Sequence, residues 1–507
     1  MSCVALLRLK EKTMNNYDLG KEALEKQDLL AAYNYFVAAA EEHPNVPSIQ
    51  LFLCHCAIQM AIKTDPLRER AFHHACKAAQ MAPEAVETWI ALGEVAMNCH
   101  KFEEAMVAFE KANTMKPDAK TWGLKGFCLA RLGKHTEALQ CYDQSLKIDP
   151  ECGESHFLLS CVVSAGEHFN PALLAYHSEK AVFCEKPTLT NEGNALWNAS
   201  HGYLHMGDYD KGWKYFDNRL KRNTMNAGQI LAPERFEKPI WEGQKNCTVL
   251  IQHEMGLGDA ITFMRYLPII QEQFNIKIIY ECMPQLMTLF RRNYPEIQCI
   301  ELDQKIDTEF QYQFFSMSLP RIAKTTSRTI PFNGAYIHAD KQDIENILQL
   351  FPKDESKLRV GLCYSGGARA HNSPAYLTDK KRSLNDEQGL DIAGRLNELG
   401  CHVISLMPDS KVFPNPHLKS FADTAALIET LDLVITVDTS VANLAGAMNK
   451  KTFLMNRFDT CWRWSRNLKS KWYPSIKEFR QKKLYDWQEV IENIIMEIKT
   501  ERAKIAA

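Results

Sequence analysis

Four strings of glycine, hydroxyl and charged residues in the second half of the chain have the composition of a ligand-binding site. The first runs from Glu254 to Ile261 and contains Gly256, Gly258 and Asp259. Its glycines permit a tight turn and the close approach of a ligand to the backbone, and they place Asp259 at the start of a helix. A third glycine is missing, so the string is not a dinucleotide fingerprint. Taken alone, it favours a strand-to-helix turn with Asp259 as the N-cap.

The second string, Leu431–Ala447, carries groups that suit a diphosphate. An apolar strand leads to Asp438, Thr439 and Ser440, where a helix of small residues begins. Exposed amides, two hydroxyls and the positive end of the helix dipole favour a bound diphosphate there. The alternative is that the hydroxyls cap the helix and the alanines pack it.

The third string, Gly361–Gly367, is a strand followed by a glycine turn with Ser365 and Gly366. A polar loop over residues 368–379 follows, and then Lys380, Lys381, Arg382 and Ser383. Cations within reach of such a turn are what a departing nucleoside diphosphate needs. Three adjacent cations are also typical of a solvated face.

The fourth string is aromatic and lies near the end of the chain. It contains Trp462, Arg463 and Trp464, followed by Trp472 and Tyr473. These rings could form a platform that stacks a base or a sugar, or they could clasp the C-terminal helix onto the preceding domain. The sequence leaves both open.

Two short patterns suggest metal binding but are better explained by local structure. Cys54 and Cys56 flank His55 without a second pair at zinc-ligand spacing. Asp208 and Asp210 lie in a glycine-containing turn, where aspartate serves turn and cap geometry. We therefore expect no metal site and no cofactor.

The strings require strands and helices that alternate. Apolar runs at 248–251, 276–280, 359–362, 403–406 and 433–437 predict strands, and 260–271, 285–292, 390–399 and 424–430 predict helices. Such alternation is typical of parallel sheets covered on both faces. We expect two Rossmann-like domains, at residues 246–352 and 353–507, the second closed by a C-terminal helix. A linker at 221–245 should precede them.

Residues 13–220 contain an internal repeat. Trp89, Gly93, Ala105, Phe109 and Pro117 lie at offsets that resemble the tetratricopeptide pattern. Other copies contain Gly20, Phe36, Ala39 and Pro44, and Trp122, Gly126, Ala138, Tyr142 and Pro150. Small residues let two antiparallel helices approach and an aromatic ring wedges between them. Stacked pairs form a solenoid whose concave surface usually holds a peptide or partner helix.

Bulk properties narrow the class of protein. The 60 Lys and Arg residues nearly balance the 62 Asp and Glu residues, so the chain has no overall positive charge that would attract a polyanion. Nucleic acid is therefore an unlikely main partner. The 16 scattered cysteines suit reduced thiols, and no window is apolar enough to be a membrane span. A cytoplasmic location is the expectation.

Taken in order, the strings resemble tetratricopeptide-repeat proteins with a heptosyltransferase-like glycosyltransferase domain of the GT-B fold. The resemblance implies a multidomain chain, with an all-α solenoid followed by two α/β Rossmann-like domains. It implies metal-independent, inverting transfer from a nucleotide-sugar donor. Asp259 matches the proposed general base, and Asn443 stands where related chains often have His. The expected donor or phosphate site comprises Gly256, Gly258, Ser365, Gly366, Arg382, Ser383, Asp438, Thr439, Ser440, Asn443 and Arg463, with Trp462 and Trp464 as the aromatic platform.

Three functions remain open from the sequence. In the first, the repeats recruit a protein acceptor to the transferase. In the second, the acceptor is a glycan, a lipid-linked glycan or a nucleobase. In the third, the chain is a repeat-based binding scaffold with a relic donor pocket. A fragment that begins near Asn246 is expected to keep nucleotide binding, because all four strings lie downstream.

Overall fold

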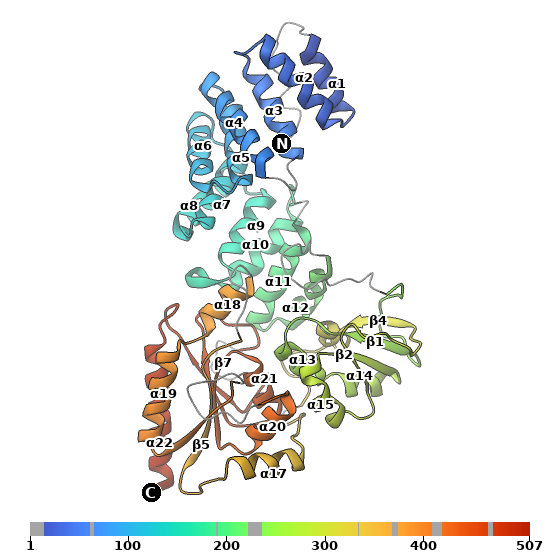
Figure 1. Ribbon diagram of the computed structural model, residues 1–507, viewed down its shortest axis with the longest axis vertical. Helices are drawn as coiled ribbons and strands as arrows, with labels where there is room; N and C mark the ends of the chain where they lie inside the picture. The colour runs from blue at the N-terminus through green and yellow to red at the C-terminus, as the bar shows by residue number, and fades with distance from the viewer. Residues whose placement is uncertain are drawn as a thin grey trace. The chain divides into compact units, whose positions relative to one another are not determined.

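The computed structural model describes residues 15–60, 65–188, 191–221, 236–332, 334–367, 374–407, 418–464 and 470–506 (Figure 1). Two compact units divide the chain. The first comprises residues 1–163 and 176–195, and the second comprises residues 164–175 and 196–507. Much of the predicted linker, residues 222–235, lies outside the described residues.

The first unit is a series of antiparallel helix pairs. Its helices are α1 Asn15–Glu25, α2 Leu29–Glu42, α3 Pro47–Met60, α4 Asp65–Met81, α5 Val86–Asn98, α6 Phe102–Met115, α7 Ala119–Arg131, α8 His135–Ile148 and α9 Gly153–Val162, with part of α10 Pro171–Phe183. Asp28 and Asp118 cap α2 and α7 by accepting a backbone N–H.

Close packing within these pairs follows from the predicted contact between glycine and an aromatic ring. A Cβ atom on Gly93 would lie 2.4 Å from the ring of Phe109, and one on Gly126 would lie 2.7 Å from Tyr142. Only a residue without a side chain therefore fits opposite each ring. The helical repeat predicted from the sequence is confirmed.

The second unit contains the end of the helical region and two parallel sheets. Its helical part includes η2 Gly166–His168, most of α11 Glu192–Met206, α12 Tyr209–Phe216 and η3 Asp217–Lys221. Asp208 caps α12 by accepting the Lys211 N–H at 3.1 Å, which confirms its predicted turn role.

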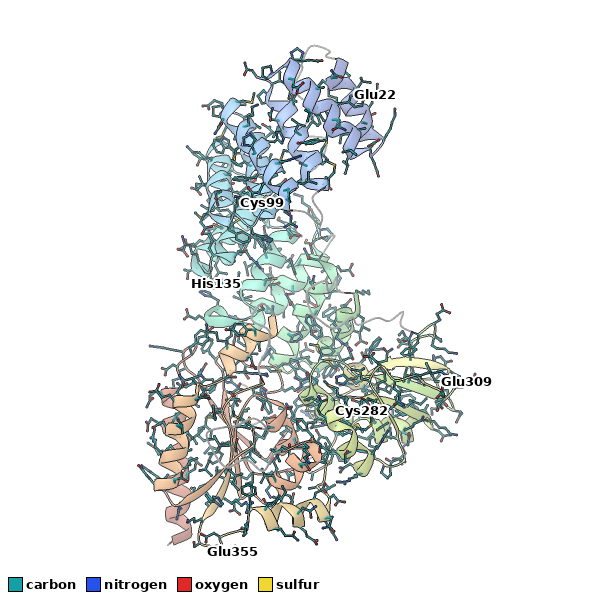
Figure 2. The ribbon with its side chains drawn as sticks, viewed as in Figure 1. Glu22, Cys99, His135, Cys282, Glu309 and Glu355 are labelled. Atoms are coloured by element: carbon teal, nitrogen blue, oxygen red, sulfur yellow. The ribbon has the colours of Figure 1, made fainter. Side chains whose placement is uncertain are left out.

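The first sheet has the order β3-β2-β1-β4. Its strands are β1 Thr248–Gln252, β2 Lys277–Cys282, β3 Gln298–Glu301 and β4 Tyr312–Phe315, and its helices are α13 Leu257–Met264, α14 Leu267–Phe274, α15 Pro284–Asn293 and α16 Leu319–Ile322, with η4 Ser316–Ser318. Helical residues pack one face, where Cys282 is buried (Figure 2). Loop residues such as Phe236 and Phe310 pack the other face.

The second sheet has the order β6-β5-β7-β8-β9. Its strands are β5 Leu358–Cys363, β6 Cys401–Ser405, β7 Leu433–Val437, β8 Thr452–Asn456 and β9 Ile476–Arg480. Helices α19 Asp386–Glu398 and α22 Gln488–Ala506 cover one face, and α20 Phe421–Glu429 and α21 Ser440–Ala447 cover the other (Figure 1). The remaining helices are α17 Lys341–Leu350 and α18 Pro374–Arg382.

The structure differs from the predicted boundaries at two places. Leu204, Tyr209, Trp213 and Phe216 belong to the apolar core of the second unit, so residue 220 is not a physical boundary. Residue 352 is not one either, because the Tyr336 N–H donates to the Ala447 carbonyl at 2.9 Å and α17 packs on α20. Both segments pack on elements beyond the predicted boundary.

The predicted helix over 260–271 is two helices. Helix α13 ends at Met264 and α14 begins at Leu267, with Pro268 in its first turn. Proline has no N–H to continue the hydrogen bonds of the preceding helix, so a break before it is expected.

Candidate ligand-binding site

The carboxyl ends of β5 and β7 form the switch point of the second sheet. From β5 the chain moves outward to β6 and then returns to the other side of β5 as β7. Open parallel sheets bind ligands outside such a point. Ser365–Gly367 follow β5 and Asp438–Ser440 follow β7, so both predicted phosphate strings lie there.

Arg382, the last residue of α18, lies beside both loops. Its Nη1 donates to the Asp438 carbonyl at 2.8 Å, and its Nε and Nη2 donate to Asp379 Oδ1 at 2.8 and 2.6 Å. The Gly366 N–H donates to Ser383 Oγ at 3.0 Å. A Cβ atom on Gly366 would lie 2.3 Å from Asp379 Oδ1, so glycine permits this close approach. The structure thus brings Gly366, Arg382, Ser383 and Asp438 together.

Helix α21 begins at Ser440, two residues after Asp438, whose carbonyl accepts from Arg382. Thr439 is its N-cap residue. The Thr439 hydroxyl makes no capping hydrogen bond and is buried, 3.4 Å from Thr436 Oγ1 and 3.8 Å from Cys363 Sγ. The hydroxyl cap considered from the sequence is therefore wrong for Thr439. Its side chain faces the core, and the first amides of α21 remain the groups that could bind an anion.

Asp259 lies on the first sheet's side of this region. Gly256 is the N-cap of α13 and Asp259 is the third helical residue, so the alternative of Asp259 as the N-cap is wrong. One Asp259 oxygen accepts the Gly256 N–H at 3.2 Å, and the other pairs with Arg463 Nη2. Asp259 and Arg463 retain 23% and 12% of their side-chain exposure, so the pair is accessible from one side.

Arg463 joins the two halves of the site. Burial alone lowers the pKa of its guanidinium, but the attraction of Asp259 and other neighbours outweighs burial and raises the pKa, so Arg463 is a permanent cation. Its neighbour Trp464 donates from Nε1 to Asp438 Oδ1 at 2.8 Å. The Asp259–Arg463 pair and the group of Asp438, Arg382 and Gly366 are therefore linked through Trp464, and we call these residues the candidate site.

Trp462 and Trp464 do not form an exposed stacking platform. They retain 5% and 1% of their exposure. Trp462 packs edge-on against Trp213 and Trp472, with ring centroids 5.6 and 5.4 Å away. Packing, the alternative left open by the sequence, is what the structure shows. The partner of Trp462 is Trp213 of α12 and not the C-terminal helix.

Gly258 and Asn443 lie at a contact between α13 and α21. Asn443 is buried; its Nδ2 donates to the Thr439 carbonyl at 3.0 Å and its Oδ1 accepts from Thr262 Oγ1 at 2.9 Å. A Cβ atom on Gly258 would lie 2.6 Å from Asn443 Nδ2. These contacts hold α13 against α21, and the assignment of both residues to the donor site stays a prediction.

Sequence reasoning missed the buried carboxylate of Asp459. Its side chain is fully buried and accepts Lys381 Nζ at 2.9 Å, Arg457 Nη1 at 3.1 Å and the Gly166 N–H at 2.7 Å. It thereby fixes Lys381, the residue before Arg382. Nothing in the local pattern distinguishes Asp459 from a surface aspartate, since two of these partners are distant in sequence.

The expectations about metal binding and membrane spans can be compared with the described residues only. Among them, no group of three or more His, Cys, Asp or Glu side chains is placed to hold a metal ion, and this includes the surroundings of Cys54 and His55. No helix in the same part of the chain has the length and apolarity that crossing a membrane requires. Residues 368–373, the first part of the predicted polar loop, lie outside the described residues.

Comparison with known proteins establishes the repeats. Two family models, each described as a tetratricopeptide repeat, match residues 86–118 and 119–152. The chain therefore contains tetratricopeptide repeats, and the sequence prediction of this motif is confirmed. A region with two parallel α/β sheets follows them.

One curated relative spans both regions. Protein FlbA of Caulobacter vibrioides is 22% identical over 454 residues, which cover 80% of this chain and 71% of FlbA. Solved structures resemble parts of the chain. PilF of Pseudomonas aeruginosa is 14% identical, with 41% of this chain and 89% of PilF covered and a TM-score of 0.34. MamA of Desulfovibrio magneticus is 15% identical, with 33% and 93% covered and a TM-score of 0.29.

Proposed function

We propose that the chain is a glycosyltransferase of the GT-B type that moves a sugar from a nucleotide-linked donor to an acceptor hydroxyl. The observation that carries the proposal is the candidate site itself. The switch point of the second sheet bears Arg382 and the start of α21, and Arg463 connects it to Asp259. Cations and helix amides at a switch point suit a diphosphate, and a nearby carboxylate suits proton removal.

In the proposed reaction the donor diphosphate lies against the start of α21 and Arg382. Asp259 removes the acceptor hydroxyl proton as the oxygen attacks the anomeric carbon, and the bond to the diphosphate breaks on the opposite side with inversion. Arg382 and Arg463 stabilise the charge that develops on the departing nucleoside diphosphate. They supply locally the positive charge that a metal ion supplies in metal-dependent transferases, so no metal is required.

The Asp259–Arg463 pair adds a condition to this reaction. One oxygen of the Asp259 carboxylate is engaged by Arg463 Nη2. An arriving diphosphate competes with Asp259 for Arg463, and the transfer of Arg463 to the phosphate frees Asp259 to act as base. Donor binding would thereby prepare the site for the acceptor.

The tetratricopeptide repeats support a protein as the acceptor, since such solenoids commonly bind peptides or partner helices. A protein held by the repeats gains effective concentration at the transferase. A glycan, lipid-linked or nucleobase acceptor would need no such surface.

Calorimetric titration with UDP, GDP, ADP and dTDP tests the donor site. We expect one nucleoside diphosphate to bind and Arg382→Ala to weaken binding, because the guanidinium offers a fork to phosphate. Lys380→Ala is the matched control, since Lys380 is exposed and should leave the affinity unchanged. Equal affinities for wild type and Arg382→Ala would remove Arg382 from the donor site. Failure of all four nucleotides to bind would favour the binding scaffold.

Asp259→Asn tests the base. The amide keeps the Gly256 N–H contact but cannot take a proton, so turnover of the donor should fall by about 10²–10⁴-fold while nucleotide binding persists. The measurement is release of the nucleoside diphosphate from its sugar conjugate. Turnover within a few-fold of wild type would exclude Asp259 as the base.

A further inference from the structure

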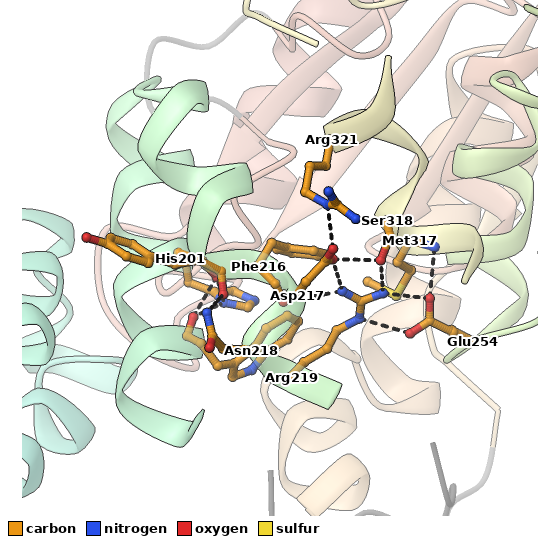
Figure 3. A network of polar contacts seen from close by, with 12 residues as sticks. His201, Phe216, Asp217, Asn218, Arg219, Glu254, Met317, Ser318 and Arg321 are labelled. Atoms are coloured by element: carbon orange, nitrogen blue, oxygen red, sulfur yellow. Dashed lines mark hydrogen bonds and ion pairs between the residues drawn. The ribbon is translucent and has the colours of Figure 1, made fainter. Parts of the chain in front are cut away.

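Arg219 comes from the helical region and is buried against the first sheet (Figure 3). It lies in η3, directly after α12, and its side chain is 2% exposed. Its partner Glu254 follows β1 by two residues and is fully buried. Arg219 Nε and Nη2 donate to the two Glu254 oxygens at 2.9 and 2.8 Å, which is the two-pronged geometry of a strong pair.

Every N–H group of Arg219 has an acceptor in this network. Besides Glu254, Nη2 donates to Ser318 Oγ at 2.8 Å, and Nη1 donates to Asp217 Oδ1 at 2.8 Å and to the Phe216 carbonyl at 3.3 Å. A guanidinium has five donors in a fixed plane, so this arrangement defines its position completely. Lysine, with three donors on one nitrogen, could not reproduce it.

Glu254 is thereby fixed at the carboxyl ends of two strands. Besides Arg219 it accepts the Met317 N–H at 2.9 Å, and Met317 follows β4. The pair therefore fills the switch point between β1 and β4, where an open sheet would otherwise admit a ligand. The second sheet retains the switch point that can receive the donor.

The turn that presents Asp259 begins at this anchor. Met255 follows Glu254 with φ of 64°, a conformation that L side chains rarely adopt. The His253 Nε2–H donates to the Met255 carbonyl at 3.1 Å, and Gly256 then starts α13. A turn with an unfavourable residue at its centre persists only when its neighbours hold it. Glu254 is the neighbour with the strongest fixed contacts.

We infer that Arg219 and Glu254 are positioning residues, through which the last helical repeat sets the geometry of the Asp259 turn. The inference rests on the proposed function only for its effect on turnover. Neither residue touches the donor groups of the candidate site. Loss of the pair should lower the rate of the chemical step without changing the affinity for the nucleotide.

The test replaces both charges at once, in the variant Arg219→Met with Glu254→Gln. Removal of one partner would leave a buried charge unpaired, whereas removal of both often costs little stability. The glutamine oxygen can still accept the Met317 N–H. Arg321→Met is the matched control, because Arg321 joins the same network through Asp217 but does not contact Glu254.

Two measurements on the full chain separate the outcomes. Hydrogen exchange of peptides over residues 253–264 should accelerate in the double variant and remain slow in the control, with residues 440–448 unchanged in both. Donor turnover should fall on the order of 100-fold, as expected for a displacement of about 1 Å, with unchanged nucleotide affinity. Unchanged exchange at 253–264 would overturn the inference, and so would unchanged turnover in a variant whose turn has loosened.

A different set of results is expected if the chain is not a glycosyltransferase. The wild type would then neither bind nor cleave any nucleotide sugar, and hydrogen exchange alone would decide whether the pair fixes the turn. Arg219→Lys covers the case in which the double variant does not fold. It keeps the charge beside Glu254 but loses the planar fork, so the turn should loosen while a cooperative melting transition shows that the variant folds. No loosening in Arg219→Lys would overturn the inference.

Discussion

Trp213→Ala should destabilise the second unit, called the α/β unit below because it holds both parallel sheets, although Trp213 belongs to a helix of the repeat region. The indole is 4% exposed and packs against Phe216, Trp462 and Trp472, with ring centroids 5.2, 5.6 and 6.5 Å away. Its Nε1 donates to the Thr325 carbonyl at 2.9 Å. Truncation of a buried tryptophan to alanine costs about 3–5 kcal/mol, and the stranded carbonyl adds about 1 kcal/mol or more. We expect a loss of about 5 kcal/mol, a large share of the roughly 5–15 kcal/mol that stabilises a domain.

Native-state hydrogen exchange can locate this loss. A decrease of about 5 kcal/mol accelerates exchange through unfolding by roughly three to four orders of magnitude. The effect should appear in β1 and β8 of the second unit and be absent from α5 and α6 of the first unit. Trp89→Ala is the matched control, because its indole donates to the Pro83 carbonyl at 2.8 Å within the first unit. Its effect should be confined to that unit.

Two results would refute the reasoning. If Trp213→Ala left exchange in β1 and β8 unchanged, the α/β unit would be stable without the last repeat. If it accelerated exchange in α5 and α6 instead, the indole would belong to the first unit.

The remaining predictions concern packing and pH. Gly258→Ala should lower the melting temperature, because the added Cβ would lie 2.6 Å from Asn443 Nδ2. Gly256→Ala should not, since the nearest neighbour of its Cβ would be 3.7 Å away. Equal melting temperatures for the two variants would contradict this prediction. In the repeats, His156 and His177 share an Nδ1 contact of 2.8 Å. Burial, with the charge of His156, lowers the pKa of His177 to about 4. The unfolded chain takes up its proton near pH 6.5. The contribution of this neutral pair is therefore complete above about pH 6.5 and is lost as the pH falls towards 4. Melting curves between pH 7 and 4.5 should show less loss for His177→Gln than for wild type.

The repeats and the strand-end loops could be predicted because their signals are local. A glycine and an aromatic residue recur at a fixed spacing in the repeats. Gly93 and Phe109 make in the structure the contact that this spacing requires. Asp438 follows an uninterrupted apolar strand, β7, so its place at a strand end could be inferred from the sequence. Where one short segment determines both the element and the side chain's position, sequence reasoning suffices.

Edge strands were harder to predict. Strands β3, β4 and β9 lie at edges of the two sheets, and their sequences mix polar with apolar residues, as in Ile476–Arg480. These three strands lack the apolar run by which the edge strand β6 and the central strands were predicted. The interior strand β8 was also missed, although Thr452–Asn456 has the length and pattern of the predicted β1.

Distant pairs could not be predicted at all. Asp259 and Arg463 are 204 residues apart, and Arg219 and Glu254 are 35 residues apart. Each residue has an ordinary explanation in its own segment, and only the folded chain brings the partners together. The same holds for Trp462, whose neighbour Trp213 lies in the repeat region.

These distant contacts change what a truncation experiment can show. A chain that begins near Asn246 lacks Gly166, Trp213 and Arg219, and it leaves Asp459 without one donor and Glu254 without its counter-ion. Breaking a buried ion pair in this way costs about 3–5 kcal/mol, before the loss of the indole is counted. Such a fragment would fail for reasons of folding, so its loss of transfer could not be attributed to lost recruitment of an acceptor. A chain that begins at Ser164 keeps every contact named here and is the fragment in which the recruiting role of the earlier repeats can be separated from the chemistry.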